Sequence, residues 1–297
     1  MKRWSAALAA LSVVVLAGCA RPAGADGNLV DDWPAHGRAV AAPPPAGACH
    51  IAPSGFAQNL TSKTLVQVGA CTDPHSSETI FIGAFSGALA DAGSPPAPDE
   101  LDGAYGECDR AAKEFLGDDW HNGRLVLLVF APTPDQWRGD GRFFRCDLTE
   151  VRSDAGRIVE RPSTLKDALR GDRPLAHGCG TSIGRGTEGG WEDLRVVPCS
   201  TAHDLEYAGF ITVSERAYPE GRSAIGSSIG VECAARVASY LGMAVAELLA
   251  HRQVNYGWWM VGKDRWAIGD RSARCYVLLE PGVTASRSLK DMGNKPI

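Results

Sequence analysis

Two stretches of the sequence, Cys71-Thr-Asp-Pro-His75-Ser-Ser-Glu78 and Cys199-Ser-Thr-Ala-His203-Asp-Leu-Glu206, share the pattern Cys-x3-His-x2-Glu. Strand-like runs lie on both sides of each stretch, at residues 65–70, 79–85, 194–198 and 207–213. Runs of this kind between turn residues predict β-strands. Each stretch is therefore expected to form a turn between two strands, once in each half of the chain.

The cysteines support the same division into two parts. The chain has nine cysteines, of which Cys19 is considered separately below. The other eight form two sets with similar intervals: Cys49, Cys71, Cys108 and Cys146, then Cys179, Cys199, Cys233 and Cys275. An even number of cysteines in an exported chain is typical of disulfides. Each set allows three pairings. We favour first with second and third with fourth, although connectivity does not follow from sequence.

The segments between the cysteines also match. The third cysteine of each set opens a segment with apolar residues at helical intervals and a final Gly, at 108–117 and 233–242, which predicts a helix. Trp137 and Trp266 each lie nine residues before the last cysteine, with a Gly-Asp pair between them that predicts a turn into a strand. The two tails, Ser163-Thr-Leu-Lys-Asp167 and Ser288-Leu-Lys-Asp291, are also alike.

These matches predict an α+β fold of two tandem repeats, each an antiparallel sheet with a packed helix, stapled by disulfides. The repeats are expected at residues 48–170 and 171–297. A length of 297 residues suits two domains that each bury a hydrophobic core.

The N-terminal residues predict export and lipid anchoring. Residues 1–18 combine a positive start with an apolar core too short to span a bilayer, which predicts a lipoprotein signal peptide. Leu16-Ala17-Gly18-Cys19 resembles a bacterial lipobox, so Cys19 is expected to carry the lipid. Residues 19–47, rich in Ala, Gly and Pro, predict a flexible linker. The expected location is the outer face of the plasma membrane.

Charge and motifs exclude several functions. The formal net charge is −5, and loss of Lys2 and Arg3 with the signal peptide would make it about −7, which does not suit a nucleic-acid partner. The sequence has no phosphate-binding loop, no Cys-x-x-Cys and no His-Glu-x-x-His. Nucleotide use, thiol redox chemistry and standard zinc proteolysis therefore lack support, and no cofactor is expected.

The His and Glu residues of the shared pattern are the strongest candidates for a site. They are His75 and Glu78 in the first part, and His203 and Glu206 in the second. Histidine and a carboxylate can bind zinc or act as an acid-base pair, and the preceding cysteine adds a third potential ligand. The alternative is a structural role, in which both side chains bond to each other or to the turn backbone. Disulfide-bonded cysteines favour that role, so no metal is predicted.

Two further patterns occur in the second part alone. Gly226-Ser227-Ser228-Ile229-Gly230 fits the Gly-x-Ser-x-Gly nucleophile motif, which needs a strand directly before it. The residues before it are turn-like, so we interpret the motif as the entry to a helix and predict no catalysis by Ser228. Trp258 and Trp259 belong to an aromatic group that is a candidate interaction surface, the alternative being strand residues in the core.

The whole set of motifs resembles the bacterial septum formation-related domain: Cys-x3-His-x2-Glu after a strand, a helix opened by Cys, and Trp-x-x-Gly-Asp-Arg before a final Cys. The second part is the closer match, since it keeps Gly269-Asp270-Arg271 where the first has Gly139-Asp140-Gly141-Arg142. The resemblance implies an actinobacterial envelope lipoprotein linked by name to septum formation, with no catalytic residues to carry over.

The resulting expectation is a non-catalytic interaction module. Its partners would be the membrane, through the lipid on Cys19, and cell-wall or division proteins. The alternative is an extracytoplasmic protein that binds a metal or small ligand through the His-Glu turns.

Overall fold

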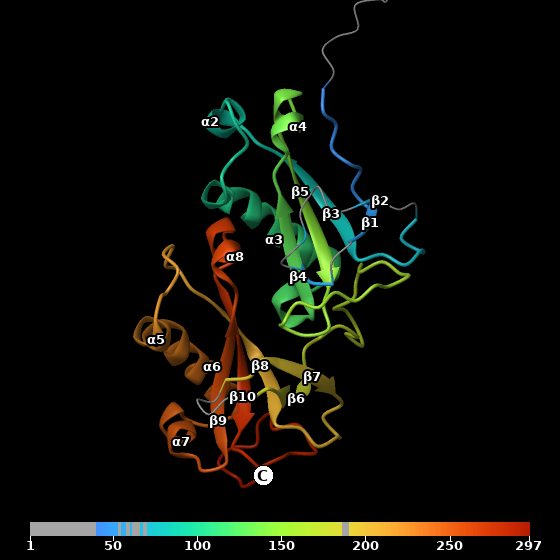
Figure 1. Ribbon diagram of the computed structural model, residues 1–297. Coiled ribbons are helices and arrows are strands. Elements are labelled where there is room, and N and C mark those ends of the chain that lie inside the picture. Colours follow the sequence, from blue (N-terminus) through green and yellow to red (C-terminus); the bar gives the residue numbers. More distant parts are fainter. Residues whose placement is uncertain (1–39, 53–54, 58–59, 61–65, 68–69, 186–189) are drawn as a thin grey trace, which may run out of the picture. The chain divides into compact units, whose positions relative to one another are not determined.

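Each His-Glu turn precedes a long strand at the middle of an antiparallel sheet in the computed structural model of the chain (Figure 1). The structure describes residues 40–52, 55–57, 60, 66–67, 70–185 and 190–297. The predicted signal peptide, Cys19 and most of the predicted linker lie outside these residues. Residues 41–297 form one compact unit.

The two sheets have the same strand order. The first sheet has the order β2-β1-β3-β5-β4, and its strands are β1 (Cys49–Ile51), β2 (Val66–Gln67), β3 (Ser77–Ala84), β4 (Leu125–Phe130) and β5 (Phe143–Glu150). The second has the order β7-β6-β8-β10-β9, and its strands are β6 (Cys179–Ile183), β7 (Asp193–Val197), β8 (Leu205–Thr212), β9 (Val254–Met260) and β10 (Ser272–Leu279). Neighbouring strands are antiparallel throughout. The predicted α+β class with antiparallel sheets is confirmed.

The register places corresponding residues at corresponding positions. Glu78 lies opposite Leu148 in the first sheet, and Glu206 lies opposite Val277 in the second. In each sheet the register shifts after the following pair of residues. This pair is Thr79 and Asp147 in the first sheet, and Tyr207 and Tyr276 in the second. The shift adds one residue to the central strand, which bends the strand locally.

One long helix packs on each sheet. These helices are α3 (Asp102–Leu116) and α6 (Val231–Leu241), and each ends at a glycine with positive φ, Gly117 or Gly242. Both helical segments begin earlier than the sequence predicts. Gly103 and Gly106 weaken the helical pattern at the start of α3, because glycine has low helix propensity. In the second half, α5 (Arg222–Ile225) and the π-helical turn η4 (Gly226–Gly230) lead directly into α6.

Short helices complete the fold. They are α2 (Gly87–Ala90), η2 (Pro98–Glu100), η3 (Trp120–Asn122), α4 (Pro134–Arg138), α7 (Val245–Ala250) and α8 (Lys263–Ile268). α4 and α8 bury the recurring indoles, since Trp137 and Trp266 are almost fully buried and donate N–H bonds to the carbonyls of Ala92 and Arg216.

Four disulfides join the cysteines in the pairing that we favoured: Cys49–Cys71, Cys108–Cys146, Cys179–Cys199 and Cys233–Cys275. The second bridge of each half joins the long helix, α3 or α6, to the strand next to the middle of the sheet, β5 or β10. In the chain-entropy description, closing loops of 20 to 42 residues contributes about 3–4 kcal/mol per bridge.

Each half has its own core between sheet and helix. The first core contains Leu116, Leu148 and Leu175, and the second contains Leu241 and Val277. Because Leu175 packs in the first core and β6 begins at Cys179, the packing changes from one half to the other between these residues. No helix within the described residues is long and apolar enough to cross a membrane.

Candidate functional site

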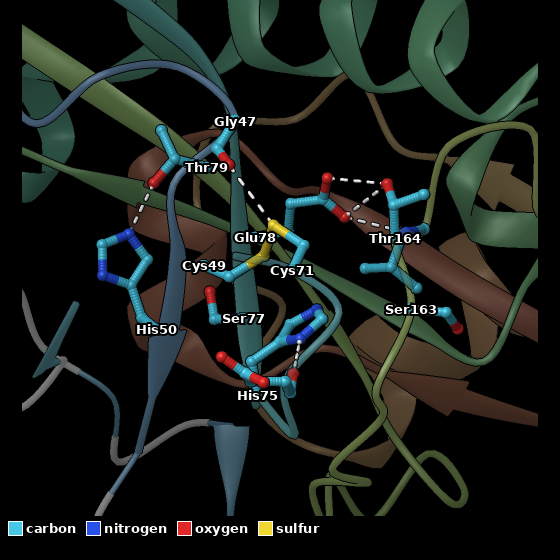
Figure 2. The surroundings of a disulfide bond; sticks show 12 residues. Gly47, Cys49, His50, Cys71, His75, Ser77, Glu78, Thr79, Ser163 and Thr164 are labelled. Carbon is cyan, nitrogen blue, oxygen red and sulfur yellow. Dashed lines mark hydrogen bonds between the residues drawn. A yellow bond between two sulfur atoms is a disulfide. The ribbon is translucent and has the colours of Figure 1, made fainter. Parts of the chain in front are cut away.

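The carboxylate of Glu78 holds the tail of the first half, as Figure 2 shows. It is buried and accepts hydrogen bonds from the Thr164 hydroxyl at 2.7 Å and from the backbone N–H of Leu165 at 2.8 Å. Leu165 in turn packs in the first core. The carboxylate therefore fastens the tail to the sheet instead of facing His75.

Glu206 has the same role in the second half. It accepts the N–H of Leu289 at 2.8 Å and a bond from the Ser288 hydroxyl. It also accepts the hydroxyl of Tyr240 at 2.6 Å, and burial together with this bond raises the pKa of Tyr240. These contacts explain why the two tails resemble each other in sequence, since each supplies a hydroxyl and a leucine N–H to a glutamate.

The histidines complete the attachment of the tails. His75 exchanges two backbone hydrogen bonds with Arg161, and His203 exchanges two with Ala285. Each ring Nδ1–H donates to a carbonyl of its own turn, that of Asp73 at 2.8 Å or Thr201 at 2.7 Å. The His-Glu pattern thus has a structural role. The glutamates bond to the tails, and the histidines bond to their own turns and to residues just before the tails.

One feature of these turns still suits a ligand. The Nε2 atoms of His75 and His203 are buried and have no hydrogen-bond partner within the described residues. Potential ligand atoms of Cys49, Cys71 and His75 lie within 4.8 Å of one another, as do those of Cys179, His203 and Glu206. In the oxidised protein the cysteines form disulfides, which lack the thiolates that zinc requires.

Ser228 lies within a continuous helical segment, in η4 between α5 and α6. Its hydroxyl donates to the Ala224 carbonyl at 2.9 Å, the usual bond of a serine to the preceding helical turn. A nucleophile elbow requires a strand directly before the serine, and here a helix precedes it.

Trp258 and Trp259 lie on opposite faces of β9. Trp258 packs against the second core, with its ring 6.0 Å from that of Tyr256. Trp259 packs on the other face, 6.3 Å from Trp191. Successive side chains of a strand alternate between faces, so the two indoles do not form one platform, and an interaction surface here would use one of them.

The residues that connect the two sheets were not identified from the sequence. Arg274 of β10 is almost fully buried and donates to the carbonyls of His121, Gly123 and Leu125 in the first half. Its guanidinium also pairs with Asp154 at 2.9 Å. The opposite charge of this carboxylate keeps the pKa of Arg274 raised despite burial.

A second group of charges lies nearby. Burial disfavours the charged form of Asp270, but the charge of Arg265 and a hydrogen bond from the Ser272 hydroxyl outweigh it, so the pKa of Asp270 is well below its usual value. Asp119, 2.6 Å from the imidazole of His121, has its pKa lowered to about 2, because the bond and charge of His121 outweigh burial there too. The His121 ring is stacked between Trp120 and Phe210.

The acidic groups around Asp119 do not form a good metal site. Asp109, Asp119 and His121 come within 4.8 Å of one another. The ammonium of Lys113 already lies 2.8 Å from Asp109 and 3.0 Å from Asp119. A cation of the protein thus already pairs with both carboxylates.

A cavity of about 510 Å³ lies beside these charges, between β4 and α8. Its walls are mainly apolar and include charged side chains of α8. The lining residues are Ala57, Leu60, Pro96, Pro98, Leu101, Tyr105, 127–131, Gly262, Lys263, Asp264, Arg265, Ile268 and Asp270. A second cavity of about 350 Å³ shares Gly262, Arg265 and Asp270 with the first. An apolar cavity with a few polar groups is the usual form of a binding site.

One sequence signal pointed toward this region. Asp270 belongs to the Gly-Asp-Arg triplet that the second half keeps and the first half lacks. In the structure Asp270 lies 3.6 Å from the His121 Nε2 atom of the first half, and Arg271 pairs with Asp102 at 2.6 Å. The remaining contact residues, such as Arg274 and Asp154, occur in no local pattern.

The family model described as Septum formation matches residues 46–275. Searches among curated proteins and among solved structures return no match.

Proposed function

Because the chain belongs to the Septum formation family, which supports a role related to septum formation, we propose that it is a non-catalytic interaction protein of the cell envelope. In this proposal it is anchored through a lipid on Cys19 to the outer face of the plasma membrane. Two tandem disulfide-stapled repeats then present surfaces to cell-wall or division proteins.

The contacts of the His and Glu residues that recur in both halves support the non-catalytic part of the proposal. A general acid or base must reach the proton that it transfers. The carboxylates of Glu78 and Glu206 are buried and bonded to the tails, and the histidines bond to their own turns. The groups that a hydrolase would need are thus employed in holding the fold together.

The repeat part of the proposal is supported by the matching strand orders, the matching register shifts and the matching disulfides. The location is supported by the lipobox-like sequence before Cys19 and by the disulfides, which persist in oxidising compartments.

Crosslinking the lipidated protein in cells and identifying the captured proteins tests this function. We expect division or cell-wall proteins, and we expect Cys19→Ala to move the protein from the membrane fraction to the soluble fraction and to lose them. Identical captures by both forms would contradict the anchored role. A robust hydrolytic activity that is lost in His203→Ala, with folding intact, would contradict the non-catalytic role.

A second candidate function is metal binding at the His-Glu turns. It is favoured by the Nε2 atoms of His75 and His203, which have no hydrogen-bond partner among the described residues, and by potential ligand atoms of the two histidines within 4.8 Å of cysteine sulfur. Metal analysis of the oxidised protein distinguishes the two functions. Stoichiometric zinc or copper that is lost in His75→Ala and His203→Ala would favour the metal site, and its absence would remove this candidate.

A further inference from the structure

Four arginines line one hollow to which both halves of the chain contribute. The hollow has a volume of about 460 Å³ and lies beside β7 and the end of β5. We refer to it as the arginine hollow. Its lining residues are Arg124, Glu150, Arg152, Arg157, Val159, Ile183, Asp193, Leu194, Arg195 and Val196.

Carboxylates do not balance the positive charge of the arginine hollow. None of its four arginines forms an ion pair with a carboxylate in the part of the chain that the structure describes. Glu150 pairs instead with Arg161, at 2.7 Å. Asp193 accepts the hydroxyl of Ser153 and the backbone N–H of Leu194. Four guanidiniums therefore share the hollow with one carboxylate that is not already paired with a cation.

This positive charge is a local property. The formal net charge of the chain is −5, so the protein as a whole does not attract anions. A cleft that carries one sign of charge between apolar walls concentrates the electric field and raises the local concentration of the opposite ion. Val159, Leu194 and Val196 supply such walls. Any attraction for an anion is therefore centred on the hollow.

Two of the arginines are held in place by other contacts. The guanidinium of Arg124 donates to the carbonyl of Ala176 at 3.1 Å and to that of Pro174 at 3.3 Å. The guanidinium of Arg157 lies over the ring of Phe56, 4.8 Å from its centroid. The other two arginines of the hollow are exposed. The hollow thus combines two oriented guanidiniums with two that are accessible from solvent.

Phosphate is the anion that suits this arrangement. A guanidinium binds carboxylate or phosphate oxygens through two parallel N–H bonds. One carboxylate has two oxygens for one such pair, whereas a phosphate monoester offers three acceptor oxygens and about two negative charges. Several guanidiniums in one hollow therefore match phosphate groups better than a carboxylate.

We propose that the arginine hollow binds a ligand with closely spaced phosphate groups. This site goes beyond the proposed interaction function and does not depend on it, since no division or wall protein enters the argument. A lipid headgroup such as that of cardiolipin and a soluble phosphate compound offer the same chemistry, and the experiment below distinguishes them.

Calorimetric titration of the full-length chain with inorganic pyrophosphate tests the proposal. We expect one pyrophosphate to bind per chain. Citrate, which carries a similar charge, should bind at least about tenfold more weakly, because each of its carboxylates has only two oxygens to offer. Absence of pyrophosphate binding would overturn the proposal, and so would citrate binding of equal strength.

Matched arginine variants locate the site. Arg152→Gln and Arg195→Gln should each weaken pyrophosphate binding about tenfold, because each removes charge-assisted hydrogen bonds. Arg110→Gln removes the same charge from α3, at an exposed position outside the hollow, and should leave binding within about twofold. All three positions are exposed, so the fold should be kept, and urea unfolding checks this. Equal weakening by all three variants would show a general effect of charge and overturn the proposal.

Vesicles identify the source of the phosphate groups. If the ligand is a lipid, the Cys19→Ala chain should sediment with vesicles of cardiolipin and phosphatidylcholine but not with phosphatidylcholine alone, and Arg195→Gln should reduce the sedimented fraction. Pyrophosphate binding without sedimentation supports the site and assigns it to a soluble phosphate compound. Loss of the captured division or wall proteins affects neither result, so the two proposals can fail separately.

Discussion

The first and second sheets share strand order and register, yet the faces that point away from the long helices differ at all but one of the compared positions. On the first sheet this face carries polar residues: His50, Ser77, Thr79, Arg145, Asp147 and Thr149. At the corresponding positions the second sheet carries Gly180, Leu205, Tyr207, Arg274, Tyr276 and Leu278. The arginine is the one residue that both faces keep. Within one fold, the face that does not pack against the long helix was free to diverge.

The polar face of the first sheet forms a chain of hydrogen bonds. The His50 imidazole N–H donates to Thr79, and the Thr79 hydroxyl donates to Asp147, both at 2.8 Å. Arg145 lies 3.0 Å from Asp147 within the same sheet. On the second sheet the corresponding arginine, Arg274, extends across to the first half instead. The same position thus serves internal pairing in one sheet and contact between the sheets in the other.

The largest expected effect comes from removing the connecting arginine. Arg274→Met should lower the free energy of unfolding by about 3–5 kcal/mol, because it leaves the carboxylate of Asp154, 1% exposed, without its charge partner. Urea unfolding at pH 7 measures this. The matched variant, Arg145→Met, should cost less, about 1–3 kcal/mol, since Asp147 keeps two hydroxyl donors. Equal costs would show that both arginines have the same role.

Acid should destabilise the protein through two buried histidines. Burial and the charge of Arg145 lower the pKa of His50 to about 4, and burial lowers that of His177 to about 3. The unfolded chain therefore binds more protons below pH 6.5, and stability falls as the pH decreases. Between pH 7 and 5 each histidine should contribute a loss of about 2 kcal/mol.

His50→Gln should remove about half of the acid-induced loss of stability that the two histidines contribute together. Urea unfolding at several pH values measures this. The second sheet has Gly180 at this position, so this part of the pH dependence belongs to the first sheet. An unchanged pH profile in His50→Gln would contradict the assignment.

A smaller effect is expected at the tails. Tyr240→Phe removes the third donor to Glu206 and should cost about 1 kcal/mol. Glu78 accepts no corresponding hydroxyl, because Phe115 occupies this place in the first half. Hydrogen exchange should become faster at the Leu289 amide and remain the same at the Leu165 amide. Faster exchange at both amides would show a global effect in place of a local one.

The smallest effect is expected at the serine motif found only in the second half. Ser228→Ala should change the free energy of unfolding by less than about 0.5 kcal/mol, since its hydroxyl bonds only to a preceding helical carbonyl among the described contacts. A serine-directed probe should leave Ser228 unlabelled. Specific labelling that Ser228→Ala abolishes would reopen the hydrolase interpretation.

Much of the fold was predictable because its signals are local or repeated. Gly117 and Gly242 end the helices as predicted, the matching cysteine intervals indicated disulfides, and the Gly-Asp pairs indicated the turns before β5 and β10. The helix starts were not predicted, since the glycines of α3 and the π-helical turn before α6 weaken the periodic pattern there. Trp258 and Trp259 could have been placed on opposite faces from strand alternation alone.

The sequence by itself predicted the strands on both sides of each His-Glu turn, the two long helices, the presence of disulfides and the importance of the His-Glu turns, because each depends on residues with fixed spacing. Only the tertiary structure decided what those residues do. The glutamates hold tails more than 80 residues away in the chain, and Arg145 and Arg274 differ in role because different surfaces lie opposite them. The partner of a side chain depends on which surface folding brings against it, and local sequence does not encode that choice.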